Sequence, residues 1–241
     1  MKTRHKHYKT VIVGSGCAGL AAAATLSANG METLLVDENP GLGGQLLRGK
    51  WPPEDLAMKL DLSKKKGFSL IRQLESLKHS RVEILPSARL AGIFNDNTLL
   101  FQNTSLPPGS QKAFEIKADH IILATGAREK YLPFPGWTLP GVMACGAAQI
   151  LMKTHGVLPA KQTFVAGTSP LQMVLASQIL LNKGETGGLF LMSSFQKNIE
   201  ILPHFPNALP KILEGTVHQL RIMAKKVPIH YRTGIVEARG K

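Results

Sequence analysis

The stretch that decides the fold, VIVGSGCAGLAAAATLSANGMETLLVDENPGLGGQ, covers Val11–Gln45. It begins with an apolar run rich in β-branched residues, which is typical of a buried parallel strand. Small apolar residues follow from Cys17 and predict a closely packed helix, which Asn29-Gly30 is suited to end. A second apolar run, residues 33–36, predicts a second strand. Together these elements predict a βαβ unit of the Rossmann type.

Three glycines between the first strand and the helix form the pattern GxGxxG, at Gly14, Gly16 and Gly19. Gly14 permits the tight turn out of the strand, Gly16 lets a pyrophosphate approach the backbone, and Gly19 lets the helix pack close to the strand. The helix start at Cys17 and Ala18 presents N–H groups and the positive end of the helix dipole to phosphate groups. The pattern therefore predicts a dinucleotide site.

A carboxylate at the tip of the second strand accepts hydrogen bonds from ribose hydroxyls in such sites. Asp37 fits this position best, and Glu38 is the neighbour that can take the role. Two other interpretations stay open, a plain tight turn and a secretory signal made of the basic residues 1–9 and the apolar run after them. The placed glycines and the acid favour the nucleotide site, because neither is a feature of signal peptides.

The same order of elements returns in residues 161–194, KQTFVAGTSPLQMVLASQILLNKGETGGLFLMSS. Gly167 keeps the first glycine position, but Ser169 and Gln172 stand where the second and third glycines would be. Ser169 and Pro170 predict a helix start, as N-cap and first helical residue. The second strand ends without an acid. Two interpretations therefore stay open, a weak NAD(P) site at Gly167 and a structural Rossmann half that binds no nucleotide.

The rest of the chain predicts two domains joined by a short connection. Residues 1–130 form the first domain, in which short strands over about 81–118 indicate a small β-meander and a later strand ends in Ala124-Thr125-Gly126. A connection rich in Pro and Gly covers 131–142, and residues 143–241 form the second domain, which opens with a helix and a glycine stop. The expected fold class is α/β, with two Rossmann-like dinucleotide-binding domains.

Composition excludes several classes of function. The chain has 241 residues and a formal net charge of +13, but aromatic residues make up only 6% and do not interleave with the basic runs, so nucleic acid is not the expected partner. The apolar stretches contain Gly, Ser and Pro at turn positions, which argues against a membrane span. Cys17 and Cys145 form neither a CxxC pair nor a metal-ligand set, so we expect no metal site and a reducing, cytoplasmic compartment. No residue has the surroundings of a general base or nucleophile, so no catalytic residue is expected.

The run ATGAREKYLPFPGWTLPGVMACGAAQILMKTHGVLPAKQTFVAGTSPL, residues 124–171, is similar to a narrow group within the flavoprotein disulfide-reductase-like superfamily, the pyridine nucleotide-disulfide oxidoreductases. The group contains the α (A) subunits of opine oxidases and of dye-linked proline or glycine dehydrogenases, and a hydrogen cyanide synthase subunit. The similarity covers the chain from Val11 to about Gly240. It implies an FAD-dependent oxidoreductase component that helps to oxidise an amine or amino acid of the opine, proline, glycine or sarcosine type.

The resemblance also implies a partner and a set of cofactor residues. A separate β-type subunit carries the amine-oxidising flavin site, and the α-type subunit passes electrons between that partner and an acceptor. The residues implied to line the FAD are Gly14, Gly16, Cys17, Ala18, Gly19, Asp37, Glu38, Gly43, Gly44, Gln45, Ala124, Thr125 and Gly126.

Two departures from the superfamily limit what the resemblance implies. Disulfide reductases carry a redox cysteine pair, and its absence here excludes an electron relay through thiols. Relatives continue beyond the position of Gly240, so we expect an incomplete second domain and a first domain without its closing strand and helix. Three hypotheses follow, namely a shortened or split α-type subunit, an inactive fragment, and an interaction module that docks on an acidic partner.

Overall fold

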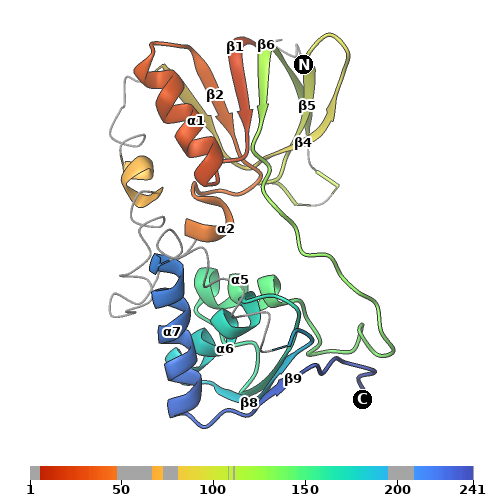
Figure 1. The fold of residues 1–241 in the computed structure, drawn as a ribbon. Helices are drawn as coiled ribbons and strands as arrows, with labels where there is room; N and C mark the ends of the chain where they lie inside the picture. Colours follow the sequence, from red (N-terminus) through yellow and green to blue (C-terminus); the bar gives the residue numbers. More distant parts are fainter. Residues whose placement is uncertain are drawn as a thin grey trace. The chain divides into compact units, whose positions relative to one another are not determined.

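The structure is a computed structural model that describes residues 6–47, 67–72, 81–107, 109–110, 112–194 and 209–240. The chain divides into two compact units, which can be followed by colour in Figure 1. Unit 1 comprises Met1–Arg48 and Ser63–Ala127, and unit 2 comprises Gly49–Leu62 and Arg128–Lys241. Each unit has its own sheet and its own hydrophobic core.

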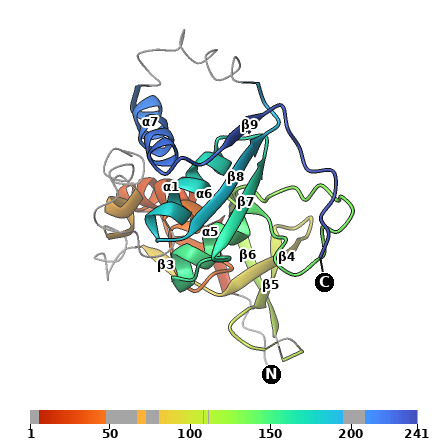
Figure 2. The same cartoon turned by 90° about the horizontal axis from the view of Figure 1, so that it is seen from below.

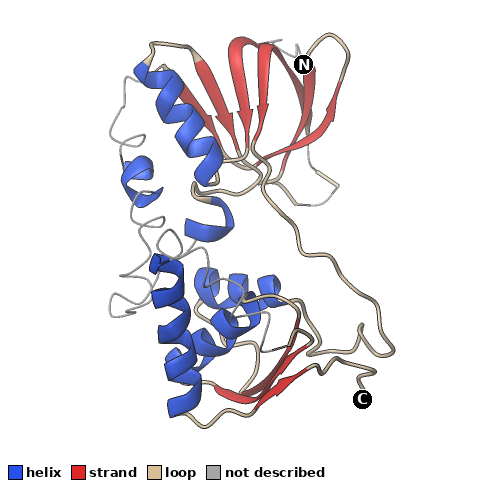
Figure 3. Cartoon of the chain, in the orientation of Figure 1, coloured by secondary structure: helices blue, strands red, loops and turns tan. Residues whose placement is uncertain are grey.

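Unit 1 is built on a six-stranded sheet with the order β3-β2-β1-β6-β5-β4. Its strands are β1 (Lys6–Val13), β2 (Thr33–Val36), β3 (Val82–Leu85), β4 (Ala88–Ile93), β5 (Thr98–Asn103) and β6 (Ala113–Leu123). The pairs β3-β2, β2-β1 and β1-β6 are parallel, whereas β6-β5 and β5-β4 are antiparallel. Helix α1 (Cys17–Ala28) lies along this sheet in Figure 3. The order β1-α1-β2 confirms the predicted Rossmann-like βαβ unit.

Alternating side chains of β1 fill the core on both faces of the sheet. Val11 and Val13 belong to one buried cluster, and Ile12 belongs to a second cluster together with Leu20 and Ala23 of α1. Successive side chains of a strand point to opposite faces, so a run of apolar residues buries both. The position of α1 on this face fixes where the loop between β1 and α1 must lie.

The meander predicted over residues 81–118 needs a correction at its first strand. β3 pairs in parallel with β2, from Thr33 opposite Val82 to Val36 opposite Leu85, and so extends the Rossmann-like part of the sheet. Only β4, β5 and β6 are joined by antiparallel pairing. The reason is burial, because β3 adds apolar surface to the core beside β2, and pattern alone does not tell a short parallel strand from an antiparallel one.

Unit 2 is built on three parallel strands in the order β7-β8-β9, which lie side by side in Figure 2. The strands are β7 (Gln162–Gly167), β8 (Glu185–Leu191) and β9 (Ile229–Tyr231), and the helices are α5 (Cys145–His155), α6 (Leu171–Leu181) and α7 (Leu209–Ala224). Gly156 ends α5 in the left-handed conformation with φ of 67°, which confirms the predicted glycine stop.

Buried polar side chains hold α6 against its neighbouring helices. Ser177 of α6 lies 2.9 Å from Nδ1 of His218 and accepts a hydrogen bond from Arg221 at 2.8 Å, both on α7. Gln149 of α5 donates to the side-chain oxygen of Gln178 on α6 at 3.2 Å. These bonds satisfy polar groups that would otherwise be costly to bury. Within the described ranges, no helix is both long and apolar enough to cross a membrane.

Candidate functional site

The loop between β1 and α1 depends on two glycines for its shape. Gly14 has a φ of 106° and donates its N–H to the carbonyl of Val36 at 2.7 Å. A Cβ added at Gly14 would collide with the carbonyl of Ala124, and one added at Gly19 would collide with the carbonyl of Gly14 itself. Both positions therefore exclude side chains, so that the turn, α1 and the end of β6 can pack together.

Gly16 is different, because a Cβ there would meet no atom of the described residues within 4 Å. Its φ is −68°, which any residue adopts, and no side chain caps α1 at this residue. The first bond within the helix runs from the N–H of Leu20 to the carbonyl of Gly16 at 2.9 Å. The helix thus begins with open space at its N-cap, as a phosphate group requires.

Asp37 is tied into the protein by four hydrogen bonds. One carboxylate oxygen accepts from the N–H of Ser15 at 2.7 Å and from its hydroxyl at 2.6 Å. The other accepts from the N–H and the side-chain amide of Asn39, both at 2.8 Å. Burial alone would raise the pKa of Asp37, but these hydrogen bonds outweigh it and hold the pKa below its ordinary value of 3.8. Asp37 is therefore ionised at neutral pH, and its hydrogen bonds to Ser15 hold the glycine loop in place.

Glu38 presents the accessible carboxylate at the tip of β2. It pairs with Nε of Arg89 at 3.2 Å, and its side chain is 37% exposed. Its backbone carbonyl accepts from the hydroxyl of Thr104 at 2.9 Å, which fixes the residue in place. The Glu38 carboxylate is partly exposed, whereas the Asp37 side chain is buried and each of its oxygens accepts two hydrogen bonds.

The Gly-Gly-Gln turn packs against the glycine loop. Gly43 donates its N–H to the carbonyl of Ser15 at 2.9 Å, and a Cβ on Gly44 would lie 2.8 Å from Cα of Gly16. Gly44 begins the short helix α2 (Gly44–Leu47) with φ of 58°. The side chain of Gln45 then donates to the carbonyl of Ala127 at 2.8 Å. The two glycines have no side chains, and the side chain of Gln45 is held by Ala127.

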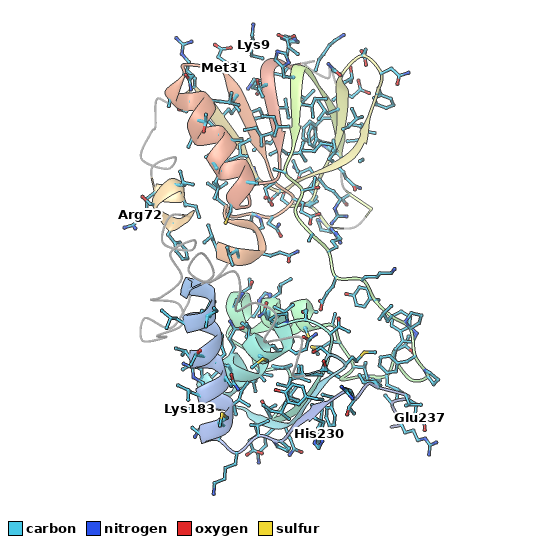
Figure 4. All side chains as sticks on the ribbon, viewed as in Figure 1. Lys9, Met31, Arg72, Lys183, His230 and Glu237 are labelled. Atoms are coloured by element: carbon cyan, nitrogen blue, oxygen red, sulfur yellow. The ribbon has the colours of Figure 1, made fainter. Side chains whose placement is uncertain are left out.

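The end of β6 completes the site. Val13 pairs with Leu123, and the N–H of Ala124 donates to the carbonyl of Val13 at 2.8 Å. Thr125 is exposed, and Gly126 has a φ of 74° with open space around its Cα. All these segments lie at the carboxyl ends of parallel strands, where α/β sheets bind ligands. Met31, which precedes β2, lies at the other end of unit 1 in Figure 4.

The structure thus brings three predicted stretches together, residues 14–19, 43–45 and 124–126. Sequence reasoning missed Ser15, which is fully buried and joins Asp37 to Gly43. The available signal was a hydroxyl residue inside the glycine pattern followed by an acid at the strand tip. Gly167 belongs to unit 2, whereas these three stretches belong to unit 1.

The two cysteines of the chain do not form a disulfide. Cys17 belongs to unit 1 and Cys145 to unit 2. Burial, followed by the nearby carboxylate of Glu129, raises the pKa of Cys145 to about 11. Only a thiolate is an effective nucleophile or redox partner. Within the described part of the chain, no three His, Cys, Asp or Glu side chains cluster as a metal site.

Residues 8–241 match the family described as pyridine nucleotide-disulphide oxidoreductase. The chain belongs to this family of oxidoreductases. Its curated relatives include the hydrogen cyanide synthase subunit HcnB of Pseudomonas aeruginosa, which is 30% identical over 96% of this chain and 49% of its own length. The A subunit of an opine oxidase from Rhizobium meliloti is 35% identical over 86% of this chain and 40% of its own length.

A solved structure has the same fold. The L-proline dehydrogenase of P. horikoshii superposes with a TM-score of 0.57 at 23% identity, over 75% of this chain and 34% of that one. The predicted resemblance to subunits of opine oxidase and hydrogen cyanide synthase is confirmed, and so is the predicted α/β class. The chain spans about half the length, or less, of the curated relatives that it matches.

Proposed function

We propose that unit 1 binds FAD, with the pyrophosphate seated on the glycine loop in front of Gly16. The observation that carries this proposal is the open space at Gly16, at the start of a helix without a side-chain cap. Gly14 and Gly19 exclude side chains for packing reasons, but the packing of the described residues does not require a glycine at position 16. A phosphate that must approach the backbone explains why a glycine stands at position 16.

The remaining residues take roles around that phosphate. Glu38 binds the adenosine ribose, Asp37 holds the loop, and Cys17 and Ala18 offer N–H groups at the helix start. Gly43, Gly44 and Gln45 line one side, and the backbone of Ala124, Thr125 and Gly126 lines the other. The flavin, when bound, supplies the redox chemistry, and the protein supplies binding and orientation.

At the level of the whole protein, we propose a component of an amine or amino-acid oxidase or dehydrogenase. Its relatives are by name subunits of an opine oxidase and a hydrogen cyanide synthase. In this proposal a β-type flavoprotein subunit oxidises the substrate, of the opine, proline, glycine or sarcosine type, and the present chain passes the electrons between that partner and an acceptor. Cys17 and Cys145 do not form a disulfide, which fits a reducing compartment, so we propose a cytoplasmic location.

The visible absorbance spectrum of the purified protein tests the cofactor. We expect a flavin spectrum, and FAD rather than FMN after release by heat, because the glycine loop is built for a pyrophosphate. If the protein arrives without flavin, titration with FAD is expected to restore the spectrum and raise the melting temperature. Folded protein that carries no flavin and takes up none on titration would overturn the proposal.

Reduction of the bound flavin tests the wider role. Candidate amines and amino acids should leave the flavin of the isolated chain oxidised under anaerobic conditions, since in this proposal the β-type subunit carries the amine-oxidising site. Addition of the β-type subunit should allow bleaching of the flavin absorbance. Equal bleaching with and without that subunit would contradict the division of labour.

A further inference from the structure

The loop in unit 2 that corresponds to the glycine loop is closed by the chain's own Gln172. This residue stands at the third glycine position, and its side chain is buried, with 7% exposed. Its side-chain oxygen accepts a hydrogen bond from the N–H of Ser169 at 2.9 Å. Ser169 occupies the second glycine position, whose backbone faces the pyrophosphate in a dinucleotide site. The amide oxygen therefore sits where a phosphate oxygen would bind.

The backbone N–H groups of the next three residues are also used or missing. Pro170 has no N–H. The N–H of Leu171 donates to the hydroxyl of Ser169 at 3.3 Å, and the N–H of Gln172 donates to the carbonyl of Ser169, also at 3.3 Å. Helix α6 spans Leu171–Leu181, and Pro170 before it already has helical angles, φ of −57° and ψ of −16°, which agrees with the predicted helix start at Ser169 and Pro170. Ser169 and Gln172 together cap the helix in the manner of a capping box.

The side chain of Gln172 also fills the space in front of Gly167. A Cβ built on Gly167, where φ is 157°, would collide with the side-chain amide of Gln172. The amide thus lies directly against the turn out of β7. In unit 1 the corresponding third residue is Gly19, which has no side chain, and the space in front of Gly16 is open. Both loops join a strand to a helix, but at the third glycine position the loop of unit 1 has no side chain and the loop of unit 2 has that of Gln172.

We propose that Gln172 is a specificity-determining residue that takes the place of a phosphate and excludes dinucleotides from unit 2. NAD(P), which the fold family suggests for this domain, does not fit a loop whose donors are internally satisfied. Unit 2 keeps the Rossmann-like fold for its packing and binds no nicotinamide dinucleotide at this loop. The inference stands independently of the FAD site in unit 1.

Binding of NADH, NADPH and ADP to engineered chains tests this assignment. All variants carry Gly16→Asp, which blocks the loop of unit 1, so that titration reports unit 2 alone. We expect the blocked protein to show no saturable binding at about millimolar ligand. Adding Gln172→Gly frees the N–H of Ser169 and the space before Gly167, and should tighten binding by about tenfold or more.

Two matched variants distinguish the effect of opening the loop from the effect of destabilising helix α6. Gln172→Glu keeps an acceptor for the N–H of Ser169 and should leave binding as weak as in the blocked protein. Gln178→Ala removes another buried amide from α6, away from the loop, and should also change nothing. Tight binding by the blocked protein, equal gains in all variants, or no gain with Gln172→Gly would each overturn the proposal.

Hydrogen exchange in the unaltered chain tests the same contact without relying on any variant. We expect the N–H of Ser169 to be protected, because it donates to the buried side chain of Gln172, and we expect its protection to be unchanged by excess NADH. Exchange at the rate of an open loop, or new protection on adding NADH, would contradict the closed loop.

Discussion

Replacing Gly16 with Asp is expected to abolish FAD binding while the protein keeps its fold. The new side chain enters open space and the backbone φ of −68° suits any residue, so the free energy of unfolding should change by no more than about 0.5 kcal/mol. The carboxylate, however, would stand within roughly 4 Å of the pyrophosphate. Repulsion of roughly 4 kcal/mol at an effective dielectric constant near 20 corresponds to about a thousandfold loss of affinity.

The measurement pairs an FAD titration with thermal melting of the same preparation. Gly92→Asp is the matched control, since Gly92 also faces open space in unit 1 but lies in β4, and this variant should bind FAD normally. Gly19→Ala gives the opposite pattern, because its Cβ collides with the carbonyl of Gly14 and should lower the melting temperature. Retention of full FAD affinity by Gly16→Asp would show that the phosphate does not bind at this loop.

Replacing Asp37 with Asn should destabilise unit 1 by about 3 kcal/mol, because hydrogen bonds to a buried carboxylate are among the stronger ones. The N–H and hydroxyl of Ser15 and the two donors of Asn39 would face an amide that offers fewer acceptor positions. FAD affinity should fall as well, since Ser15 shapes the glycine loop. Denaturant unfolding followed by circular dichroism measures the loss.

The pH dependence of the same comparison has a definite sign. The pKa of Asp37 in the folded chain lies below its ordinary value of 3.8, so its stabilising effect is complete above that value. The effect is lost as the pH falls through the folded pKa. The stability difference between the natural chain and Asp37→Asn should therefore be constant near neutral pH and shrink only below about pH 4.

Glu38→Gln is the matched control for Asp37→Asn, because it replaces the neighbouring carboxylate with an amide in the same way. Its pair with Arg89 is exposed, so the stability should change by less than about 1 kcal/mol. FAD affinity should nevertheless fall, because a ribose hydroxyl loses a charged acceptor. An unchanged free energy of unfolding in Asp37→Asn, together with an unchanged FAD affinity in Glu38→Gln, would contradict the roles assigned to the two acids.

Local sequence patterns were enough to predict the two Rossmann-like units, the glycine turn and the glycine stop after α5, whereas the family was predicted from the resemblance of residues 124–171 to known proteins. These features depend on local conformational preference and on apolar periodicity, both of which are written along the chain. Even the cap by Gln172 had a local signal, since Ser169 and Gln172 have the spacing of a capping box.

Tertiary packing was needed to establish how the neighbouring acids differ and where β3 belongs. Asp37 is held by Ser15, twenty-two residues earlier, and β3 joins β2 across a long stretch of chain. Packing also distinguishes Gly16, with open space around it, from Gly19, which has none. Such choices depend on which atoms meet through space, and an unpaired donor or a buried carboxylate is satisfied by whatever the folded chain places beside it.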